Sequence, residues 1–337
     1  CWGGNDRGEL GLGDMNPRGD EVGEMGDSLP AIDLGTGRTA KSVVTGYQFT
    51  CAILDNGSVK CWGSNTDGQL GQGDYATRGD NGGEMGNNLS AIDLGAGRKA
   101  KALALGDSFA CAILDNGSVK CWGDNSYGQL GLGDTRDRGD GMGEMGASLP
   151  AVNLGSGRKA KAITAGTLHV CAILDNGSVK CWGASGNGRL GSGEETNDVG
   201  DEPDEMGNDL DTVDLGTSRK AKVIVAGWFS TCAILDDGSV KCWGMNSLGA
   251  LGLGDENARG DEPNEMGNYL PAVSLGGSRR AVYLAMGYLQ ACAILDDGSL
   301  RCWGNNLFGQ LGQGNTLNRG DGYGEMGDAL KPVPLTG

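Results

Sequence analysis

The sequence predicts an all-β fold that is built from one repeated unit. The triplet Cys-Trp-Gly returns at intervals of 60 or 61 residues along the 337-residue chain, at Cys1, Cys61, Cys121, Cys181, Cys242 and Cys302. Each triplet after the first follows a pair of apolar arms around an Asn-Gly or Asp-Gly turn, the strongest short signal for a β-hairpin. Helical periodicity is absent, so we expect several short strands in each repeat.

The elements follow the same order in every repeat. In the second repeat, Cys-Trp-Gly leads into the glycine-rich segment 68–73 and then into an acidic loop that contains Glu-Met-Gly. A basic and apolar run follows at 99–106, and its partial alternation predicts a half-buried strand. The hairpin at 111–121 closes the repeat. One extra residue lies between Gly193 and Glu205, and we place this insertion in a loop.

Four short strands in each repeat of about 60 residues predict a β-propeller of six or seven four-stranded blades, because radial repetition protects the strand edges. We expect one propeller domain over residues 1–337, with repeats 1–60, 61–120, 121–180, 181–241 and 242–301 and a partial repeat 302–337. Cys1 lacks the cysteine that precedes its equivalents in later repeats, so we expect the chain to be an excerpt of a longer secreted precursor.

A family resemblance supports this fold. The pattern Trp-Gly-x4-Gly-x-Leu-Gly-x-Gly, placed after an Ala-Ile-Leu-Asp-Asn-Gly hairpin, resembles the regulator-of-chromosome-condensation repeat family. The resemblance implies a propeller, typically of seven blades. It leaves function open, because family members include a nuclear nucleotide-exchange factor, a photoreceptor and a secreted enzyme inhibitor, and one fold hosts many activities.

The cysteine spacing predicts five cross-strand disulfides. If the hairpin loop is residues 55–57, Cys51 lies directly opposite Cys61, at a separation that a disulfide accepts. The same spacing recurs, and the predicted pairs are Cys51 with Cys61, Cys111 with Cys121, Cys171 with Cys181, Cys232 with Cys242, and Cys292 with Cys302. Buried thiols or paired metal ligands are the alternatives, but nine intervening residues do not match zinc spacing. Five regular pairs favour an oxidising compartment and an extracellular or cell-surface protein of the secretory pathway.

Charge and composition exclude several classes of function. The chain has 44 Asp and Glu against 27 Lys and Arg, a net charge of −17, which opposes binding to nucleic acid. One histidine excludes a histidine-rich metal site, and no catalytic constellation is evident. No apolar run is long enough to insert into a membrane as a helix.

Positions that differ between otherwise similar repeats are the candidates for recognition. Large aromatic residues gather at two of these positions, in the segment after the first strand and in the segment after Cys-Trp-Gly. The predicted partner-binding residues are Tyr47, Phe49, Phe109, Tyr127, Trp228, Phe229, Tyr288 and Phe308. The alternative is that these rings fill a central channel or pack between blades.

Other motifs favour structural roles. The Cys-Trp-Gly tryptophans are expected in the blade cores, and His169 is expected to be structural. The recurring Arg-Gly-Asp, which has Val199 in place of arginine in the fourth repeat, predicts a turn in which arginine pairs with a carboxylate. The acidic loops are expected to be solvated, with no cofactor; a calcium site is the alternative. Four sequons leave N-glycosylation open, at Asn56, Asn88, Asn116 and Asn176.

These observations predict a non-enzymatic β-propeller that binds a protein, or copies of itself, as a module of an extracellular assembly. Family analogy offers guanine-nucleotide exchange or signalling regulation as an alternative. A carboxylate-based glycosidase is the other alternative, since a propeller can place two acids at a channel mouth.

Overall fold

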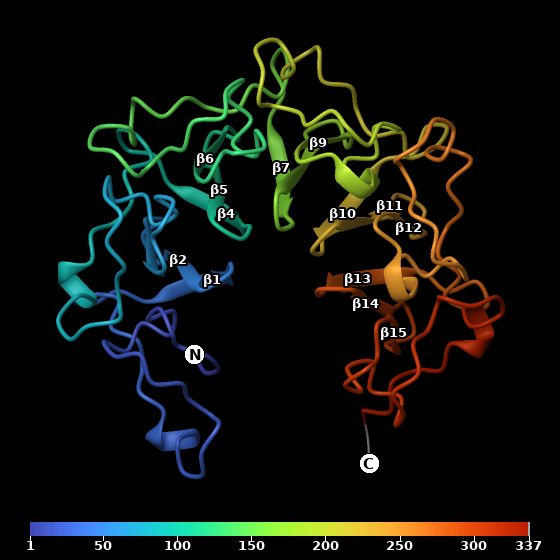
Figure 1. The fold of residues 1–337 in the computed structure, drawn as a ribbon, viewed down its shortest axis with the longest axis horizontal. Helices are drawn as coiled ribbons and strands as arrows, with labels where there is room; N and C mark the ends of the chain where they lie inside the picture. The colour runs from blue at the N-terminus through green and yellow to red at the C-terminus, as the bar shows by residue number, and fades with distance from the viewer. Residues whose placement is uncertain (336–337) are drawn as a thin grey trace. The chain divides into compact units, whose positions relative to one another are not determined.

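The computed structural model describes residues 1–335, so the last two residues of the predicted partial repeat lie outside the described part. The described chain has fifteen β-strands in five antiparallel sheets of three strands each (Figure 1). The strands are β1 Ala40–Thr45, β2 Phe49–Leu54, β3 Val59–Gly63, β4 Ala100–Leu105, β5 Phe109–Leu114, β6 Val119–Gly123, β7 Ala160–Ala165, β8 His169–Leu174, β9 Val179–Gly183, β10 Ala221–Ala226, β11 Ser230–Leu235, β12 Val240–Gly244, β13 Ala281–Met286, β14 Gln290–Leu295 and β15 Leu300–Gly304. Five short 3-10 helices are Gly26–Ser28, Gly86–Asn88, Gly186–Gly188, Ser247–Gly249 and Gly327–Ala329.

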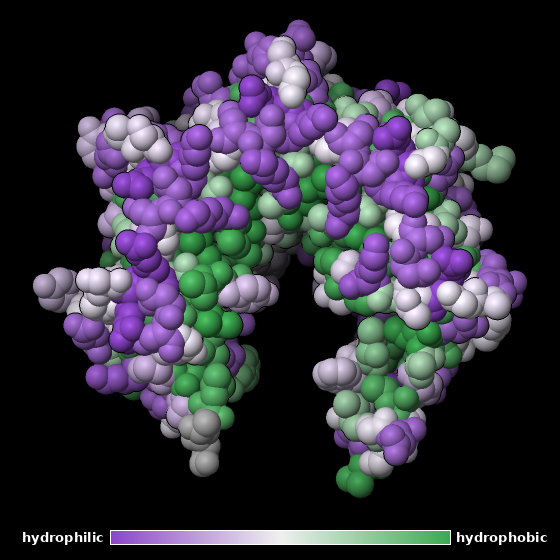
Figure 2. Space-filling view, turned by 180° about the vertical axis from the view of Figure 1, so that it is seen from behind, coloured by the Kyte–Doolittle hydropathy of each residue, from purple (hydrophilic) through white to green (hydrophobic). Residues whose placement is uncertain are grey.

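The chain divides into two compact units. The first comprises Cys1–Asn153 with Asp201–Pro203 and holds β1 to β6; the second comprises Leu154–Gly200 with Asp204–Gly337 and holds β7 to β15. Each sheet pairs its strands in chain order, with the middle strand buried along its length in the first four sheets. Hydrophilic residues cover much of the loops, whereas hydrophobic residues gather over the strands (Figure 2). No described helix is long and apolar enough to cross a membrane.

The prediction of six or seven four-stranded blades matches neither in number nor in strand count, because the described residues form five sheets of three strands each. The expected fourth strand is reduced to a single β-bridge, in which Gly63 and Arg78 exchange hydrogen bonds of 2.7 and 3.2 Å. The segment between them contains Gly68, Gly71 and Gly73, each with a positive φ. Because a backbone that turns this way cannot stay extended, the segment meets β3 at one residue pair only.

The predicted hairpin register and all five predicted disulfides are confirmed. Leu54 donates its amide to the carbonyl of Ser58 at 2.8 Å across the loop, which sets Cys51 opposite Cys61. Disulfides join the five predicted pairs, one in each sheet, between the second and third strands. Cys1 is the free cysteine of the described residues and is exposed.

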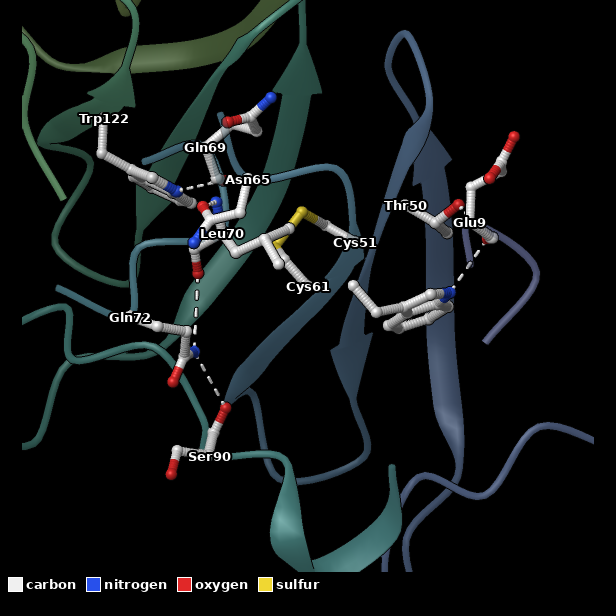
Figure 3. The surroundings of a disulfide bond; sticks show 11 residues. Glu9, Thr50, Cys51, Cys61, Asn65, Gln69, Leu70, Gln72, Ser90 and Trp122 are labelled. Carbon is white, nitrogen blue, oxygen red and sulfur yellow. Dashed lines mark hydrogen bonds between the residues drawn. A yellow bond between two sulfur atoms is a disulfide. The ribbon is translucent and has the colours of Figure 1, made fainter. Parts of the chain in front are cut away.

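The tryptophan of a sheet packs under the glycine-rich loop of the repeat before it. The indole Nε1 of Trp122 donates a hydrogen bond of 3.0 Å to the carbonyl of Gln69, close to the disulfide between Cys51 and Cys61 (Figure 3). Equivalent bonds join Trp62 to Glu9, Trp243 to Arg189 and Trp303 to Ala250. Each bond ties one sheet to a loop that lies more than fifty residues earlier in the sequence.

A glycine makes room for the indole. Gly11 has a φ of +68°, and a Cβ at this position would lie 2.7 Å from Nε1 of Trp62. Gly252 stands in the same relation to Trp303, at 2.8 Å. The glycine of the Leu-Gly dipeptide is therefore required both by its backbone conformation and by the close approach of the ring.

A buried lysine ties the acidic loop to the sheet. In the first unit, the ammonium group of Lys60 donates hydrogen bonds to the carbonyls of Leu34 (3.0 Å) and Gly86 (2.7 Å). Burial lowers the pKa of this lysine, and the nearby charge of Asp33 opposes that shift. Gly86 belongs to Glu-Met-Gly, so the recurrence of that motif has a structural reason: its carbonyl binds the cation of the hairpin.

Trp2 corrects the prediction that all six Cys-Trp-Gly tryptophans are buried. Its side chain is 67% exposed, whereas those of Trp62, Trp122, Trp182, Trp243 and Trp303 have 0% exposure. Trp2 lies outside the five described sheets, and its neighbour Gly3 pairs only through a β-bridge with Arg18.

We predict that Trp122→Phe lowers the free energy of unfolding by about 1–3 kcal/mol, because it removes a buried hydrogen bond and leaves part of the indole volume empty. Trp2→Phe is the matched control and should leave stability unchanged within about 0.5 kcal/mol. Chemical denaturation followed by circular dichroism measures both variants. An equal loss of unfolding free energy in the two variants would contradict the stabilising role of the buried Trp122 indole.

Candidate functional site

The predicted aromatic residues separate into exposed and buried groups. Tyr47, Tyr127, Tyr288 and Phe308 are exposed. Trp228 and Phe229 are half-buried. These six residues are accessible to a partner, and Trp228, Phe229 and Tyr288 of the second unit contact one another.

Phe49 and Phe109 are corrections to the predicted partner-binding set. Each begins the second strand of its sheet and is almost fully buried, at 1% and 0% exposure. A Cβ on Gly46 would lie 2.1 Å from the ring of Phe49, so that ring fills the space left by the glycine of its own turn. Both phenylalanines therefore belong to the core.

In the second unit, an arginine and three aromatic rings stack in sequence. The guanidinium carbon of Arg189 lies 4.4 Å from the ring centroid of Phe229. The Phe229 ring stacks on Trp228 with centroids 4.3 Å apart and an interplanar angle of 25°. Trp228 in turn lies 3.6 Å from Tyr288, centroid to centroid. We call Arg189, Trp228, Phe229 and Tyr288 the aromatic stack.

Backbone packing positions the aromatic stack. Trp228 lies in the turn between β10 and β11, and Tyr288 lies in the turn between β13 and β14. A Cβ on Gly227 would lie 2.7 Å from the carbonyl oxygen of Gly287, so glycine allows the two turns to approach each other closely. The carbonyl of Trp228 also accepts hydrogen bonds from the amide (3.2 Å) and hydroxyl (2.5 Å) of Thr167.

This arrangement suits contact with another protein. Tyr288 is 52% exposed, so one end of the stack faces solvent while Arg189 is buried at the other end. Large rings held on short turns lose little conformational entropy on binding and bury a large area, which is why tryptophan and tyrosine dominate protein-binding hot spots.

The second unit also contains an acidic pocket of about 580 Å³ that sequence reasoning missed. Its acidic lining is Glu194, Asp198, Glu205, Asp209, Asp211, Asp214 and Glu262. Val199, which replaces the arginine of the recurring Arg-Gly-Asp, also lines it. The insertion and this replacement were the signals available in the sequence. The described residues contain no group of ligands arranged to hold a metal ion.

The predicted pairing of the Arg-Gly-Asp arginine with a carboxylate is confirmed in the first, second, third and fifth repeats, whereas Arg319 has Asn315 in place of the aspartate and donates to the carbonyl of Asn318. Arg78 forms an ion pair of 2.8 Å with Asp74, four residues earlier. The carboxylate of Glu84, from Glu-Met-Gly, accepts hydrogen bonds from the amides of Gly79 (2.9 Å) and Asn81 (3.1 Å). Arg78 and Glu84 are therefore both held within the loop.

His169 is buried at the start of β8. Its Nε2 lies 2.9 Å from the hydroxyl oxygen of Thr231 in β11, and its Nδ1 has no hydrogen-bond partner within residues 1–335. Burial, with a smaller contribution from the charge of Arg189, lowers the pKa of His169 to about 3. The ring is therefore neutral at physiological pH and inaccessible to a substrate, which agrees with the predicted structural role.

Comparison with known proteins identifies the family. The family model of the RCC1-like domain matches residues 1–336. The chain belongs to the RCC1-like domain family. This RCC1-like chain is 30% identical over 322 residues to the ultraviolet-B receptor UVR8 of Arabidopsis thaliana, covering 94% of the chain and 63% of the receptor. It is 28% identical to the mitochondrial RCC1 domain-containing protein RUG3 of the same plant, covering 80% of the chain and 55% of that relative.

Solved structures show the same fold. Prp20p from Saccharomyces cerevisiae, a protein with binding properties toward Gsp1p and histones, matches with a TM-score of 0.66 at 21% identity. The match covers 93% of this RCC1-like chain and 67% of the Prp20p structure. Human WBSCR16 matches with a TM-score of 0.63 at 19% identity, over 83% of the chain and 65% of that structure. These likenesses establish an RCC1-like propeller fold.

We predict that His169 makes stability depend on pH. The pKa of His169 is about 3 in the folded chain and near 6.5 in the unfolded chain, so the unfolded state binds an extra proton between these values. The contribution is fully present above about pH 6.5 and falls by about 1.4 kcal/mol for each pH unit below it. Through His169, the free energy of unfolding should fall by roughly 2 kcal/mol between pH 7 and pH 5.

The variant His169→Gln tests this prediction, because glutamine stands at the equivalent position, Gln290, in the fifth repeat. Chemical denaturation at pH 7 and pH 5 should show a smaller loss of stability in the variant than in the native chain. Identical losses in the two proteins would remove His169 as a source of the pH dependence.

Proposed function

We propose that this RCC1-like propeller is a non-enzymatic, extracellular or cell-surface module that binds a protein partner through the aromatic stack. The observation that carries the proposal is the ring contact between Trp228 and Tyr288, which are held on two adjacent turns with Tyr288 half exposed. We further propose that the repeats form a single propeller domain, which would hold these turns on a rigid support.

Two features support a protein partner. An RCC1-like neighbour binds proteins, since yeast Prp20p, also called yeast RCC1, has binding properties toward Gsp1p and histones and has been crystallised bound to Kap60. The net charge of −17 favours a partner whose contacting surface is basic, because opposite charges speed association. A second copy of the chain is the alternative partner, and it would have to overcome repulsion between like charges.

The disulfides support the extracellular location. Five cross-strand disulfides would be reduced in the cytosol of most organisms, whereas they persist in oxidising compartments. We predict that peptide mapping of native material without reductant yields five linked pairs. Free thiols at these ten positions in native material would overturn the extracellular assignment and leave an intracellular regulator as the better explanation.

Photo-crosslinking tests the binding surface. We predict that a photoreactive phenylalanine analogue at position 288 forms adducts with one protein from the extracellular fraction of the source organism. The same analogue at position 107, the equivalent turn position in the second repeat, is the matched control and should form few adducts. An adduct with the mass of two chains would identify a second copy as the partner.

The variant Trp228→Ala should weaken binding of the captured partner about tenfold or more, as expected for a hot-spot residue worth roughly 2 kcal/mol. Circular dichroism and thermal melting establish that the variant is folded, and Tyr288→Ser provides a second variant at the exposed end of the stack. Equal capture at positions 107 and 288, or unchanged affinity in both variants, would contradict the proposed surface.

A further inference from the structure

Three of the five described hairpin tips carry an N-glycosylation sequon in an exposed position. Asn56, Asn116 and Asn176 each precede Gly-Ser, and all three side chains are exposed. The equivalent residues in the fourth and fifth repeats are Asp237 and Asp297. The repeats therefore provide an internal comparison of asparagine and aspartate in the same turn.

One oxygen of this side chain builds the turn, and both residue types supply it. Oδ1 of Asn56 accepts hydrogen bonds from the amide (3.0 Å) and hydroxyl (2.7 Å) of Ser58. Oδ1 of Asp237 accepts the same two bonds from Ser239, at 3.0 and 2.6 Å. The structure of the turn thus does not require asparagine rather than aspartate.

The second terminal atom of the side chain, Oδ2 or Nδ2, distinguishes the aspartate tips from the asparagine tips. Oδ2 of Asp237 pairs with Arg219 at 3.0 Å, and Oδ2 of Asp297 pairs with Arg279 at 3.1 Å. In contrast, the amide nitrogen Nδ2 donates no hydrogen bond to any described residue at the three asparagine tips, which are Asn56, Asn116 and Asn176. The atom that is specific to asparagine has no structural task there.

The fourth sequon differs. Asn88 lies in a 3-10 helix, its Nδ2 donates a hydrogen bond of 2.7 Å to the carbonyl of Gly83, and the next residue, Leu89, is buried. A glycan on Asn88 would have to fit beside an amide nitrogen that is already held against the acidic loop, whereas Nδ2 at a hairpin tip is held by no described residue.

We propose that Asn56, Asn116 and Asn176 are N-glycosylation acceptors and that Asn88 is not. The proposal rests on the secretory location given under the proposed function. The donor is a lipid-diphosphate-linked oligosaccharide. A bond forms between Nδ2 and the anomeric carbon, the bond from that carbon to the diphosphate oxygen breaks, the lipid diphosphate leaves with the electron pair, and Nδ2 releases one proton.

The position of the tips is compatible with the proposed binding surface. In the third sheet, Asn176 follows the end of β8, whereas the turn that contains Thr167 precedes its start. The six residues of β8 separate the two ends by roughly 20 Å of extended chain. A glycan on this hairpin tip would therefore project from the end of the sheet opposite the turn that contacts Trp228.

Mass spectrometry of site occupancy tests the proposal. The full chain, with a signal peptide, is expressed in eukaryotic cells, and the endoplasmic reticulum pool and the secreted pool are each treated with an N-glycan-releasing amidase in ¹⁸O water. We expect the isotope label at Asn56, Asn116 and Asn176 in both pools and none at Asn88, measured as the excess over a parallel digestion without the amidase, because Asn-Gly also deamidates without a glycan. The triple variant N56D/N116D/N176D should carry no glycan and keep native stability, because aspartate retains the bonds to serine.

Two further variants test whether asparagine at the hairpin tip is sufficient for glycosylation. Asp237→Asn and Asp297→Asn create the same sequon in the remaining hairpins and should each add one glycan per chain. A chain from the endoplasmic reticulum pool with intact disulfides but no label at the three tips would overturn the proposal. Label at Asn88 equal to that at the tips would overturn the proposal that the local structure of Asn88 prevents its glycosylation. Loss of partner capture with the glycans present would count against the proposed function only.

Discussion

The hydrogen bond from a buried tryptophan indole to the glycine-rich loop of the preceding repeat is the interaction on which the rest of the structure depends. Each three-stranded sheet is too small to bury both of its faces, so it needs its neighbours. The hydrogen bond from Trp122 to the carbonyl of Gln69 fixes one sheet against the loop of the preceding repeat, and the adjacent disulfide fixes the hairpin that carries the tryptophan. A glycine with a positive φ leaves the space that the ring occupies. These three requirements explain why tryptophan, cysteine and glycine recur together.

The hairpins could be predicted from the sequence because their geometry is local. Asn-Gly in a three-residue loop sets the register, and the register sets Cys51 opposite Cys61. The outermost strand was predicted wrongly, because extended pairing there is prevented by glycines whose positive φ no pattern of hydrophobicity reveals. Trp2 differs from Trp62 for a reason visible in the sequence: its Cys-Trp-Gly triplet is the same, but it is not part of a hairpin in the five described sheets, and its side chain is exposed.

The candidate site could be predicted only in part, because the sequence indicates which turns carry aromatic residues but not which of those residues are exposed or in contact. Aromatic variation pointed to the turn after the first strand, but only Tyr47 lies in that turn and is exposed, whereas Phe49 begins β2 and is buried. The ring contact between Trp228 and Tyr288 joins residues sixty positions apart and depends on the approach of two turns through Gly227. The acidic pocket arises from the inserted loop and Val199, a single departure from the repeat pattern.

The bond that holds neighbouring repeats together has a consequence for how this chain can diversify. Its acceptor is always a main-chain oxygen, so the side chain at that position is glutamate, glutamine, arginine or alanine without loss of the bond. Arg189 occupies such a position: its carbonyl serves the scaffold while its guanidinium group packs on Phe229. Mutation can therefore change the side chain that packs beside this contact, as the buried guanidinium group of Arg189 packs on Phe229, while the hydrogen bond between repeats is kept.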